Sequence, residues 1–523
     1  MSVRQRARSI SASAAGRWGG VAPWVAVAAY VLVALVYLVR GRINFDEGWY
    51  LYAGRLAYRG EVPYRDFAYT QTPLLPYVYG LPQTVLSSLW VGRVTSLVLA
   101  TAGLGMLVVL VRRLARPLTA VLTALLVAAV PPVVYFLTIT KTYALSFALF
   151  AATLLALTSD RPQRVRYPLA VAAASAMTLT RSPGAGLAAT VFVFCLVTAE
   201  DAVVRRNVAV TAAGFAAALV AFILVAPESA LWNLVGYHQQ LWEGVGYSTR
   251  LSDVLGRLPE WFSWYSVAAI VILLALVLAA VSRPTRAYCR SQGAIVVGAI
   301  GVVTFLAVQL AASQFNPVEY AVPVYPVAVA LALVVIDRFL VDGEIVLPAT
   351  VRRWGVIVPA VAMGVAGVLR LTPSDFVDPA GSELGLTAAD RLGDYVADHT
   401  APGDEVLALW RQDVNITADS PGPPDVSVGI FSYTDLSTDR AESVHFLNLP
   451  MLLSLLEQRR PAVVVLDEVD WAVLERNGFF SAEPGDPGAV AALLEEGYEL
   501  TYEQEGRSGT GDGRVRVEVW LRR

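Results

Sequence analysis

Long runs of apolar residues recur along most of this chain and restrict its fold more than any other feature. A helix needs about 20 apolar residues to cross the hydrocarbon core of a bilayer. Val21 to Val39 and Val91 to Val111 are two of the runs that supply such a length. Of the 523 residues, 56% are hydrophobic and 16% are charged, a balance that is too apolar for a soluble protein of this size. The sequence therefore predicts a polytopic α-helical membrane protein.

The basic residues decide between two membrane topologies. The segment Thr72 to Arg113 has room for one crossing or for two. A single crossing at Val91 to Val111 puts all the nearby arginine clusters in the cytoplasm, as the positive-inside rule prefers. These clusters lie at 112–116, 161–166 and 205–206. The chain then makes about eleven crossings, the last at Val356 to Leu369, with the extension 1–20 inside the cell and the loop 41–90 outside. One of the crossings is expected over 117–137, and an outer loop rich in aromatic residues is expected over 227–264.

The last part of the chain has the composition of a soluble domain. From about Ser374, a helical pattern over Leu386 to His399 precedes apolar runs with the spacing of strands, expected at 405–409, 462–466 and 515–521. The segment 383–523 holds 26 of the 43 acidic residues but 11 of the 40 Lys and Arg residues. This asymmetry favours a location outside the cytoplasm. We therefore expect a transmembrane domain over 21–373 and an extracytoplasmic α/β domain over 374–523.

A polar and aromatic segment, Ile43 to Gly80, follows the first crossing directly. Ionisable groups held at a bilayer usually mark a substrate path. Apolar residues from Trp49 to Leu56 recur at i, i+3, i+4 and i+7, so a short helix can lie on the membrane surface with Asp46 and Glu47 at its start. The three prolines of TPLLPYVYGLPQ predict a half-embedded element rather than a span. The segment is predicted to be the active-site loop of a membrane enzyme.

Two kinds of site receive no support from the sequence. Cys195 and Cys289 fall at different levels of the predicted topology, so we expect neither a disulfide nor a thiolate metal site. The arginines are scattered over loops and are not gathered with aromatic residues on one face, so we expect no nucleic-acid partner.

Several motifs together resemble a known superfamily. They are the Asp-Glu pair that opens the surface helix, PYRDF after it, the half-embedded element, KTYALSF after a short second outer loop, TRSPG at Arg181, and EYAVPVYP at Glu319 to Pro326. The order of these motifs along Trp24 to Arg338, and the side of the membrane on which each is expected, resemble the pattern of the GT-C superfamily of integral-membrane glycosyltransferases. The likeness is greatest to the branch of protein O-mannosyltransferases and lipid A aminoarabinose transferases, of the glycosyltransferase family 39 type.

The resemblance implies an activity and its partners. Such enzymes take a sugar from a polyprenyl-phosphate carrier on the outer side of the cell membrane and transfer it, with inversion, to a hydroxyl of a glycan, lipid or protein. The resemblance assigns Asp46 as general base, with Glu47 beside it in the catalytic loop. It implies no required cofactor, and a divalent metal is possible but not indicated. The chain departs from the family pattern at Gln71 and Thr72, and it has Lys141 where relatives often have an aspartate.

Departure of the lipid phosphate requires fixed positive charge near the leaving oxygens. The candidates for this role are Lys141, Arg181, Arg55 and Arg65. A second group of residues is expected to contact the sugar or the prenyl chain: Trp49, Tyr50, Trp232, Trp242, Glu319 and Tyr320.

Other interpretations of the same residues stay open at this level. Asp46 also suits a helix N-cap, and Lys141 and Arg181 also suit anchors at the membrane surface. The aromatic loop residues are also typical of an interfacial belt. For the whole protein, the alternatives are a transporter or flippase of lipid-linked sugars and a non-catalytic subunit of a glycan assembly complex.

Overall fold

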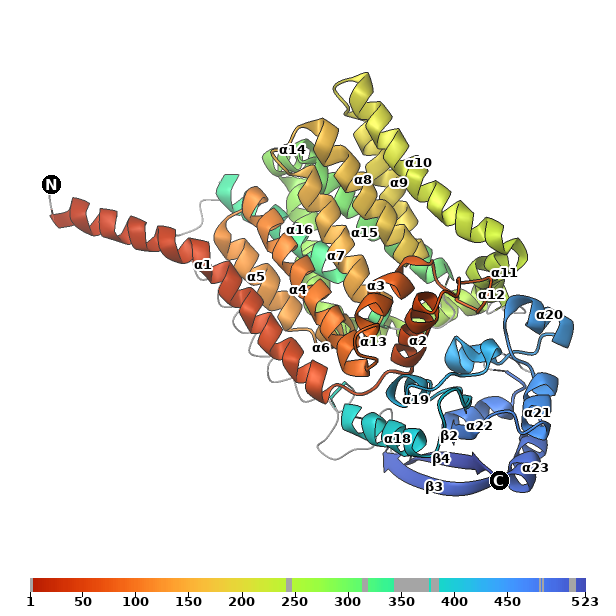
Figure 1. Cartoon of the computed structure of the whole chain (residues 1–523). Helices are drawn as coiled ribbons and strands as arrows, with labels where there is room; N and C mark the ends of the chain where they lie inside the picture. Colours follow the sequence, from red (N-terminus) through yellow and green to blue (C-terminus); the bar gives the residue numbers. More distant parts are fainter. Residues whose placement is uncertain are drawn as a thin grey trace.

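The structure, a computed structural model, describes residues 3–240, 247–312, 318–342, 376–377, 385–478, 481, 484–507 and 514–523. A bundle of helices forms most of the molecule, and a smaller domain with a β-sheet lies against one end of it (Figure 1). This arrangement confirms the predicted fold class, a polytopic helical bundle followed by a C-terminal α/β domain. The predicted crossing Val356 to Leu369 lies outside the described residues, as does Trp242.

The bundle is built from apolar helices, because a helix satisfies its own backbone hydrogen bonds within lipid. Its helices are α1 (Val3–Arg40), α4 (Leu89–Leu114), α5 (Pro117–Ala128), α6 (Pro131–Thr138), α7 (Thr142–Leu157), α8 (Gln163–Thr180), α9 (Ala185–Val197), α10 (Ala202–Val225), α13 (Tyr247–Val281), α14 (Arg283–Ser291), α15 (Gly293–Ala312) and α16 (Tyr325–Asp342). Five of the described helices are long and apolar enough to cross a membrane, or six if the bent pair α5 and α6 is one span. The predicted count of about eleven crossings is therefore not confirmed.

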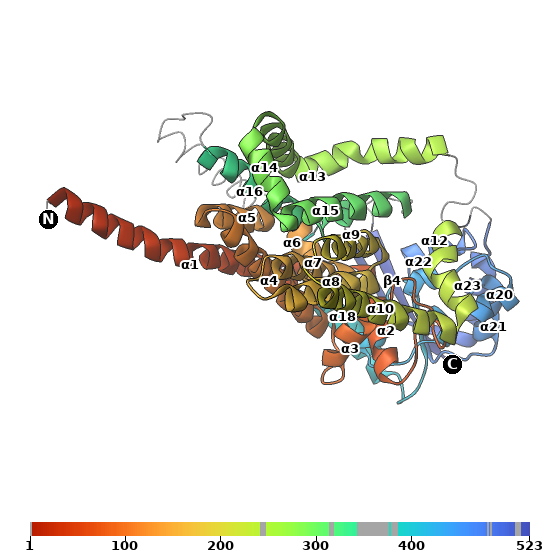
Figure 2. The ribbon, with the colours of Figure 1, turned by 90° about the horizontal axis from the view of Figure 1, so that it is seen from above.

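A sharp bend separates α5 from α6, where the sequence predicted one crossing over 117–137. The chain bends there by 79°. Pro131 and Pro132 begin α6, and a proline has no N–H with which to continue the hydrogen-bond ladder of the preceding helix. The bend leads through α6 to the short turn 139–141, which ends at Lys141 directly before α7. Seen from above, α7 lies between α4 and α8 in the middle of the bundle (Figure 2).

The segment 227–264, predicted as an aromatic outer loop, is largely helical in its described residues. It contains α11 (Pro227–Leu231), a π-helical turn (Trp232–Gly236), α12 (Tyr237–Gln240) and the first part of α13. Trp261 and Tyr265 lie one helical turn apart, and their ring centroids are separated by 5.9 Å. Trp261, one of the aromatic residues that indicated a surface loop, therefore shares a face of a long helix with Tyr265, which follows the predicted loop.

The predicted surface helix is α2 (Phe45–Tyr58), and the broken element contains α3 (Leu74–Gln83). The Asn44 side chain accepts a hydrogen bond from the Asp46 N–H, and the Glu47 carboxylate accepts one from the Asn44 N–H. The N-cap of α2 is therefore Asn44 and not Asp46. The two helices meet at Gly54 and Gly80, where a Cβ on Gly80 would lie 2.5 Å from the Gly54 carbonyl oxygen.

The C-terminal domain contains a four-stranded sheet in the order β1-β2-β4-β3. β1 (Val406–Ala408) is parallel to β2 (Val463–Asp467), and β4 (Arg514–Arg522) is antiparallel to β2 and to β3 (Tyr498–Arg507). The predicted strands correspond to β1, β2 and β4. β3 was not predicted because its glutamates suit an edge strand and not a buried one. The helices of this domain are α18 (Leu386–Asp398), α19 (Asp413–Thr417), α20 (Thr438–Val444), α21 (Leu449–Glu457), α22 (Glu468–Leu474) and α23 (Pro487–Gly497).

Candidate active site

Three segments that are far apart in the sequence bring charged side chains together beside α2. Asp46 lies in the first turn of α2, Lys141 in the turn before α7, and Glu319 in the 3-10 turn Val318–Ala321. The Lys141 Nζ is 2.7 Å from Asp46 Oδ2 and 2.8 Å from Glu319 Oε1. The side chains of Lys141, Asp46 and Glu319 are 4%, 13% and 16% exposed, so water has little access to this charged cluster.

Lys141 is the cation at the centre of the charged cluster. Burial by itself would lower its pKa, because the ammonium loses hydration. The carboxylates of Asp46 and Glu319 outweigh this effect and hold the pKa of Lys141 well above its ordinary value. Lys141 therefore stays protonated at physiological pH. Its ammonium carries three N–H donors, of which Asp46 and Glu319 take two.

The two carboxylates have further donors that fix their orientation. Trp49 Nε1 donates to Asp46 Oδ1 over 2.9 Å, so both oxygens of Asp46 are engaged. The Tyr143 hydroxyl donates to Glu319 Oε1 over 2.8 Å. Trp49 lies one turn along α2 from Asp46, and Tyr143 lies at the start of α7. Helix ends thus hold the charged cluster in a defined geometry.

Arg181, another predicted phosphate ligand, is buried next to the charged cluster. Its Nε donates to Gln309 Oε1 over 3.0 Å, and its Nη1 donates to Thr142 Oγ1 over 2.8 Å. The rings of Tyr143 and Tyr320 lie 5.0 and 5.3 Å from the guanidinium carbon. Tyr143 thus contacts Arg181 through its ring and Glu319 through its hydroxyl. Arg181, Lys141, Glu319 and Tyr320, predicted separately, are therefore brought together.

An aromatic wall adjoins Asp46. The ring of Trp49 stacks on Tyr50 with a centroid distance of 3.7 Å and meets Tyr69 edge-on at 5.9 Å. Burial raises the pKa of Tyr50 and of Tyr69, so both phenols are neutral. The Tyr69 hydroxyl is buried and has no hydrogen-bond partner among the described residues. An unpaired buried hydroxyl costs about 1–3 kcal/mol, and a hydroxyl-rich ligand can provide the missing bond.

Glu47, the neighbour of Asp46, is engaged outside the charged cluster. Arg93 of α4 donates to both Glu47 carboxylate oxygens over 2.8 and 2.7 Å, and both side chains are fully buried. Glu47 also accepts the Thr140 N–H over 3.3 Å. Arg93 in turn donates to the carbonyl oxygens of Leu38, Gly41 and Arg42. The Glu47–Arg93 ion pair therefore joins α2, α4, the end of α1 and the turn that carries Lys141. Because it holds these segments together, Glu47 is a positioning residue.

The other predicted residues make their contacts elsewhere. Arg55 donates to carbonyl oxygens of the C-terminal domain, and Arg65 pairs with Asp66 on the exposed part of the loop. The Trp232 ring lies 5.2 Å from the Arg440 guanidinium carbon of the C-terminal domain. Sequence patterns did not single out Tyr69, Thr142 or Gln309. Thr142 belongs to the KTYALSF motif, but nothing in the motif indicates that its hydroxyl accepts from Arg181.

We expect Arg55→Met to loosen the C-terminal domain far more than Asp419→Ala. Arg55 donates to the Asn415 and Asp419 carbonyl oxygens over 2.8 and 2.7 Å, and methionine can make neither bond. Such bonds from a charged donor contribute about 1.5–3 kcal/mol each. The Asp419 side chain is 74% exposed, so its ion pair contributes at most about 1 kcal/mol. Limited proteolysis of the full chain compares the variants, and equal protease resistance would contradict this expectation.

The donors present suit an internal cation better than a metal ion. The ammonium of Lys141 occupies the space between the Asp46 and Glu319 carboxylates. Within the ranges that the structure describes, no three His, Cys, Asp or Glu side chains are arranged to hold a metal.

Comparison with known proteins identifies the fold. No protein-family model and no curated protein matches the chain. The crystal structure of ArnT from Cupriavidus metallidurans bound to undecaprenyl phosphate is similar, with a TM-score of 0.60 and 15% identity, over 97% of this chain and 98% of that chain. Its apo state, also 15% identical over 97% of this chain and 98% of that chain, has a TM-score of 0.56. The chain thus has the fold of these ArnT structures, in agreement with the fold class predicted from the sequence.

Proposed function

We propose that this protein is a membrane glycosyltransferase that moves a sugar from a polyprenyl-phosphate carrier to an acceptor hydroxyl. One observation carries the proposal: Asp46, Lys141 and Glu319 meet in one shielded cluster although they come from distant parts of the sequence. The fold adds support, since ArnT was crystallised with undecaprenyl phosphate. A carboxylate next to fixed cations is what sugar transfer from a phosphate leaving group requires.

Asp46 is the proposed general base. As the acceptor oxygen attacks the anomeric carbon of the donor, a new C–O bond forms and the hydroxyl proton passes to the Asp46 carboxylate. The bond between the anomeric carbon and the phosphate oxygen breaks, and its electron pair leaves with polyprenyl phosphate. Attack from the side opposite the phosphate inverts the anomeric centre. Trp49 and Lys141 orient the carboxylate for this proton transfer.

Lys141 and Arg181 are the proposed ligands of the donor phosphate. Asp46 and Glu319 leave one Lys141 N–H for a phosphate oxygen. Arg181 keeps Nη2 free of hydrogen bonds to any residue that the structure describes. Negative charge on the leaving oxygens grows in the transition state, so cations held in place stabilise that state most. Trp49, Tyr50, Tyr69 and Tyr320 are the proposed sugar or prenyl contacts, with Tyr69 added to the residues predicted from sequence.

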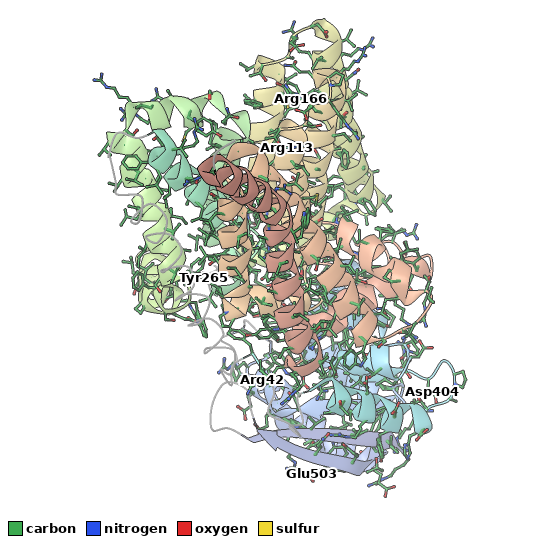
Figure 3. The ribbon with its side chains drawn as sticks, turned by 90° about the vertical axis from the view of Figure 1, so that its left-hand side faces the viewer. Arg42, Arg113, Arg166, Tyr265, Asp404 and Glu503 are labelled. Carbon is green, nitrogen blue, oxygen red and sulfur yellow. The ribbon has the colours of Figure 1, made fainter. Side chains whose placement is uncertain are left out.

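The proposed orientation puts the charged cluster and the C-terminal domain outside the cell. Arg113 and Arg166 lie at one end of the molecule, and Asp404 and Glu503 of the C-terminal domain lie at the other (Figure 3). Arginines in short loops are retained in the cytoplasm. This separation of charge supports a cytoplasmic N-terminus and an active site that opens outward in the cell membrane.

Release of free carrier tests the proposed function. Purified protein is incubated with a panel of polyprenyl-phosphate sugars and a cell-envelope extract as acceptor, and liberated polyprenyl phosphate is measured. Wild type is expected to release carrier from at least one donor. Lys141→Met is expected to slow release by about 10²–10³-fold, because a fixed cation at the leaving group is lost. Arg65→Met is a matched control, since Arg65 is 48% exposed and paired with Asp66 on the same loop.

The possible outcomes separate the alternatives. Donor binding without carrier release from any donor would favour a non-catalytic subunit. Movement of intact donor across vesicles, again without release, would favour a flippase. Equal rates for Lys141→Met and wild type would remove Lys141 from the phosphate site while leaving the reaction class intact.

A further inference from the structure

A cavity of about 740 Å³ lies at the end of the bundle opposite the charged cluster. Its walls come from the ends of α4, α7, α8, α9, α14 and α15. Arg113 and Arg166, which line it, lie at the end of the bundle far from the C-terminal domain (Figure 3). The proposed reaction makes no use of this cavity.

Three arginines from three different helices line the cavity: Arg113 of α4, Arg166 of α8 and Arg290 of α14. Asp160 is the only acidic residue in the lining, so cations predominate. Among the described residues, none of the three arginines forms a salt bridge, whereas Arg116 at the same end of the bundle pairs with Asp337. The charge that surrounds the cavity is therefore available to an anionic ligand.

Hydrogen bonds orient two of these guanidinium groups without neutralising them. Arg113 Nη1 donates to the Thr158 carbonyl oxygen over 3.0 Å, and Arg166 Nη1 donates to the Ser159 carbonyl oxygen over 3.1 Å. The Nε of Arg166 is buried and has no hydrogen-bond partner within the described part of the chain. A buried donor without a partner is costly, and a phosphate oxygen is a strong acceptor for a guanidinium.

Most of the cavity lining is polar, and a smaller apolar part adjoins the arginines. Leu114, Leu157 and Ala294 are buried there, and Phe194 and Val296 are half-buried. A site for a free inorganic anion gains nothing from such a wall. A lipid presents a phosphate group next to apolar chains, and basic pockets between membrane helices are typical sites for lipid head groups.

We propose that this cavity binds the phosphate of an anionic membrane lipid, with Arg113, Arg166 and Arg290 as the ligands of the head group. A phosphate group could also come from a soluble compound, since the arginines would bind it in the same way. The position of the cavity between the ends of membrane helices, together with the smaller apolar part of its lining, favours a lipid as the source of that phosphate. This inference does not depend on the proposed glycosyltransferase activity.

Binding of phosphatidylglycerol by the full chain tests the inference. The protein is purified in a neutral detergent, and native mass spectrometry counts bound lipid during titration with phosphatidylglycerol, phosphatidylcholine or inorganic phosphate. We expect one saturable phosphatidylglycerol site and no such site for the other two. The triple variant Arg113→Gln, Arg166→Gln and Arg290→Gln is expected to bind about a hundredfold more weakly, at roughly fivefold for each basic residue.

A matched control removes the same charge from the same three helices outside the cavity. This variant carries Arg112→Gln, Arg164→Gln and Arg283→Gln, and all three positions are exposed. It is expected to bind phosphatidylglycerol within about twofold of wild type, since its substitutions leave the lining intact. Equal losses in the two triple variants would overturn the proposal, because binding would then follow the overall charge of the surface.

If the triple variant of Arg113, Arg166 and Arg290 (the pocket triple variant) does not fold, a variant that leaves the charge unchanged can test the proposal instead. Ser291→Trp places a large ring at an exposed lining position and is expected to block the lipid sterically. Wild-type binding by a folded Ser291→Trp variant would contradict a lipid in the cavity. Saturable binding of inorganic phosphate that competes with phosphatidylglycerol and is lost in the pocket triple variant would keep the phosphate site but assign it to a soluble ligand.

Discussion

Replacement of Asp46 with asparagine is expected to reduce sugar transfer by about 10²–10⁴-fold, the usual contribution of general base catalysis. The amide has almost the same shape as the carboxylate. Its one oxygen can still accept the Trp49 hydrogen bond, but its NH2 group then faces the Lys141 ammonium, so that ion pair is lost. The amide cannot take the acceptor proton. Lys141 keeps its bond to Glu319 in this variant, so the phosphate site retains a bound cation. The rate of carrier release at saturating donor measures the effect.

This variant also separates catalysis from helix capping. Asparagine caps helices as well as aspartate does, and the N-cap of α2 is in any case Asn44. Loss of activity in Asp46→Asn would therefore not come from a lost helix cap. Asp66→Asn is the matched control, because Asp66 lies on the same loop and pairs with the exposed Arg65. Full activity of Asp46→Asn beside an unaffected Asp66→Asn would remove Asp46 from the catalytic role.

Replacement of Arg93 with methionine is expected to destabilise the protein by about 3–5 kcal/mol and to abolish transfer. The change leaves the fully buried Glu47 carboxylate without its cation, which is costly in a medium of low dielectric constant. It also removes the donors to three carbonyl oxygens at the end of α1. Because Glu47 holds the first turn of α2 and accepts the Thr140 N–H, both Asp46 and Lys141 lose their support.

A conservative variant distinguishes positioning from charge at this pair. Arg93→Lys keeps the positive charge but cannot make two parallel bonds to Glu47 and reach the α1 carbonyls as well. Its melting temperature and its maximal rate are expected to fall between those of wild type and Arg93→Met. Thermal unfolding in detergent and carrier release at saturating donor are the measurements. Wild-type stability and rate in Arg93→Met would show that the buried pair does not position the charged cluster.

Much of the membrane fold was predictable because hydrophobicity is a property of each local segment. The run Val91 to Val111 must avoid water wherever the rest of the chain goes, and it lies within α4. The bend before α6 was missed although Pro131 and Pro132 were visible, since a run of apolar residues has the same composition whether it is straight or bent. The helical part of 227–264 was missed because its aromatic residues suit a helix face as well as a membrane-surface loop.

The members of the charged cluster were predictable one at a time, but their pairing was not. The family resemblance assigned Asp46, Lys141 and Glu319 to one site, but no sequence pattern indicated that Lys141 pairs with both carboxylates. Arg55 was a candidate for the same site, yet the structure binds it to the C-terminal domain. A sequence pattern that marks a residue as polar and close to the membrane cannot state which partner it meets.

By itself, the sequence determined a helical membrane protein with an acidic C-terminal segment, and with candidate site residues in one polar loop and beside several later apolar runs. Only the tertiary structure decided that Lys141 joins Asp46 to Glu319, that Glu47 is matched by Arg93, and that three arginines surround a cavity at the far end of the bundle. The reason is physical. The free energy gained by moving an apolar segment out of water is set by the residues of that segment itself. The free energy of a buried charge depends instead on partners that folding brings from distant segments.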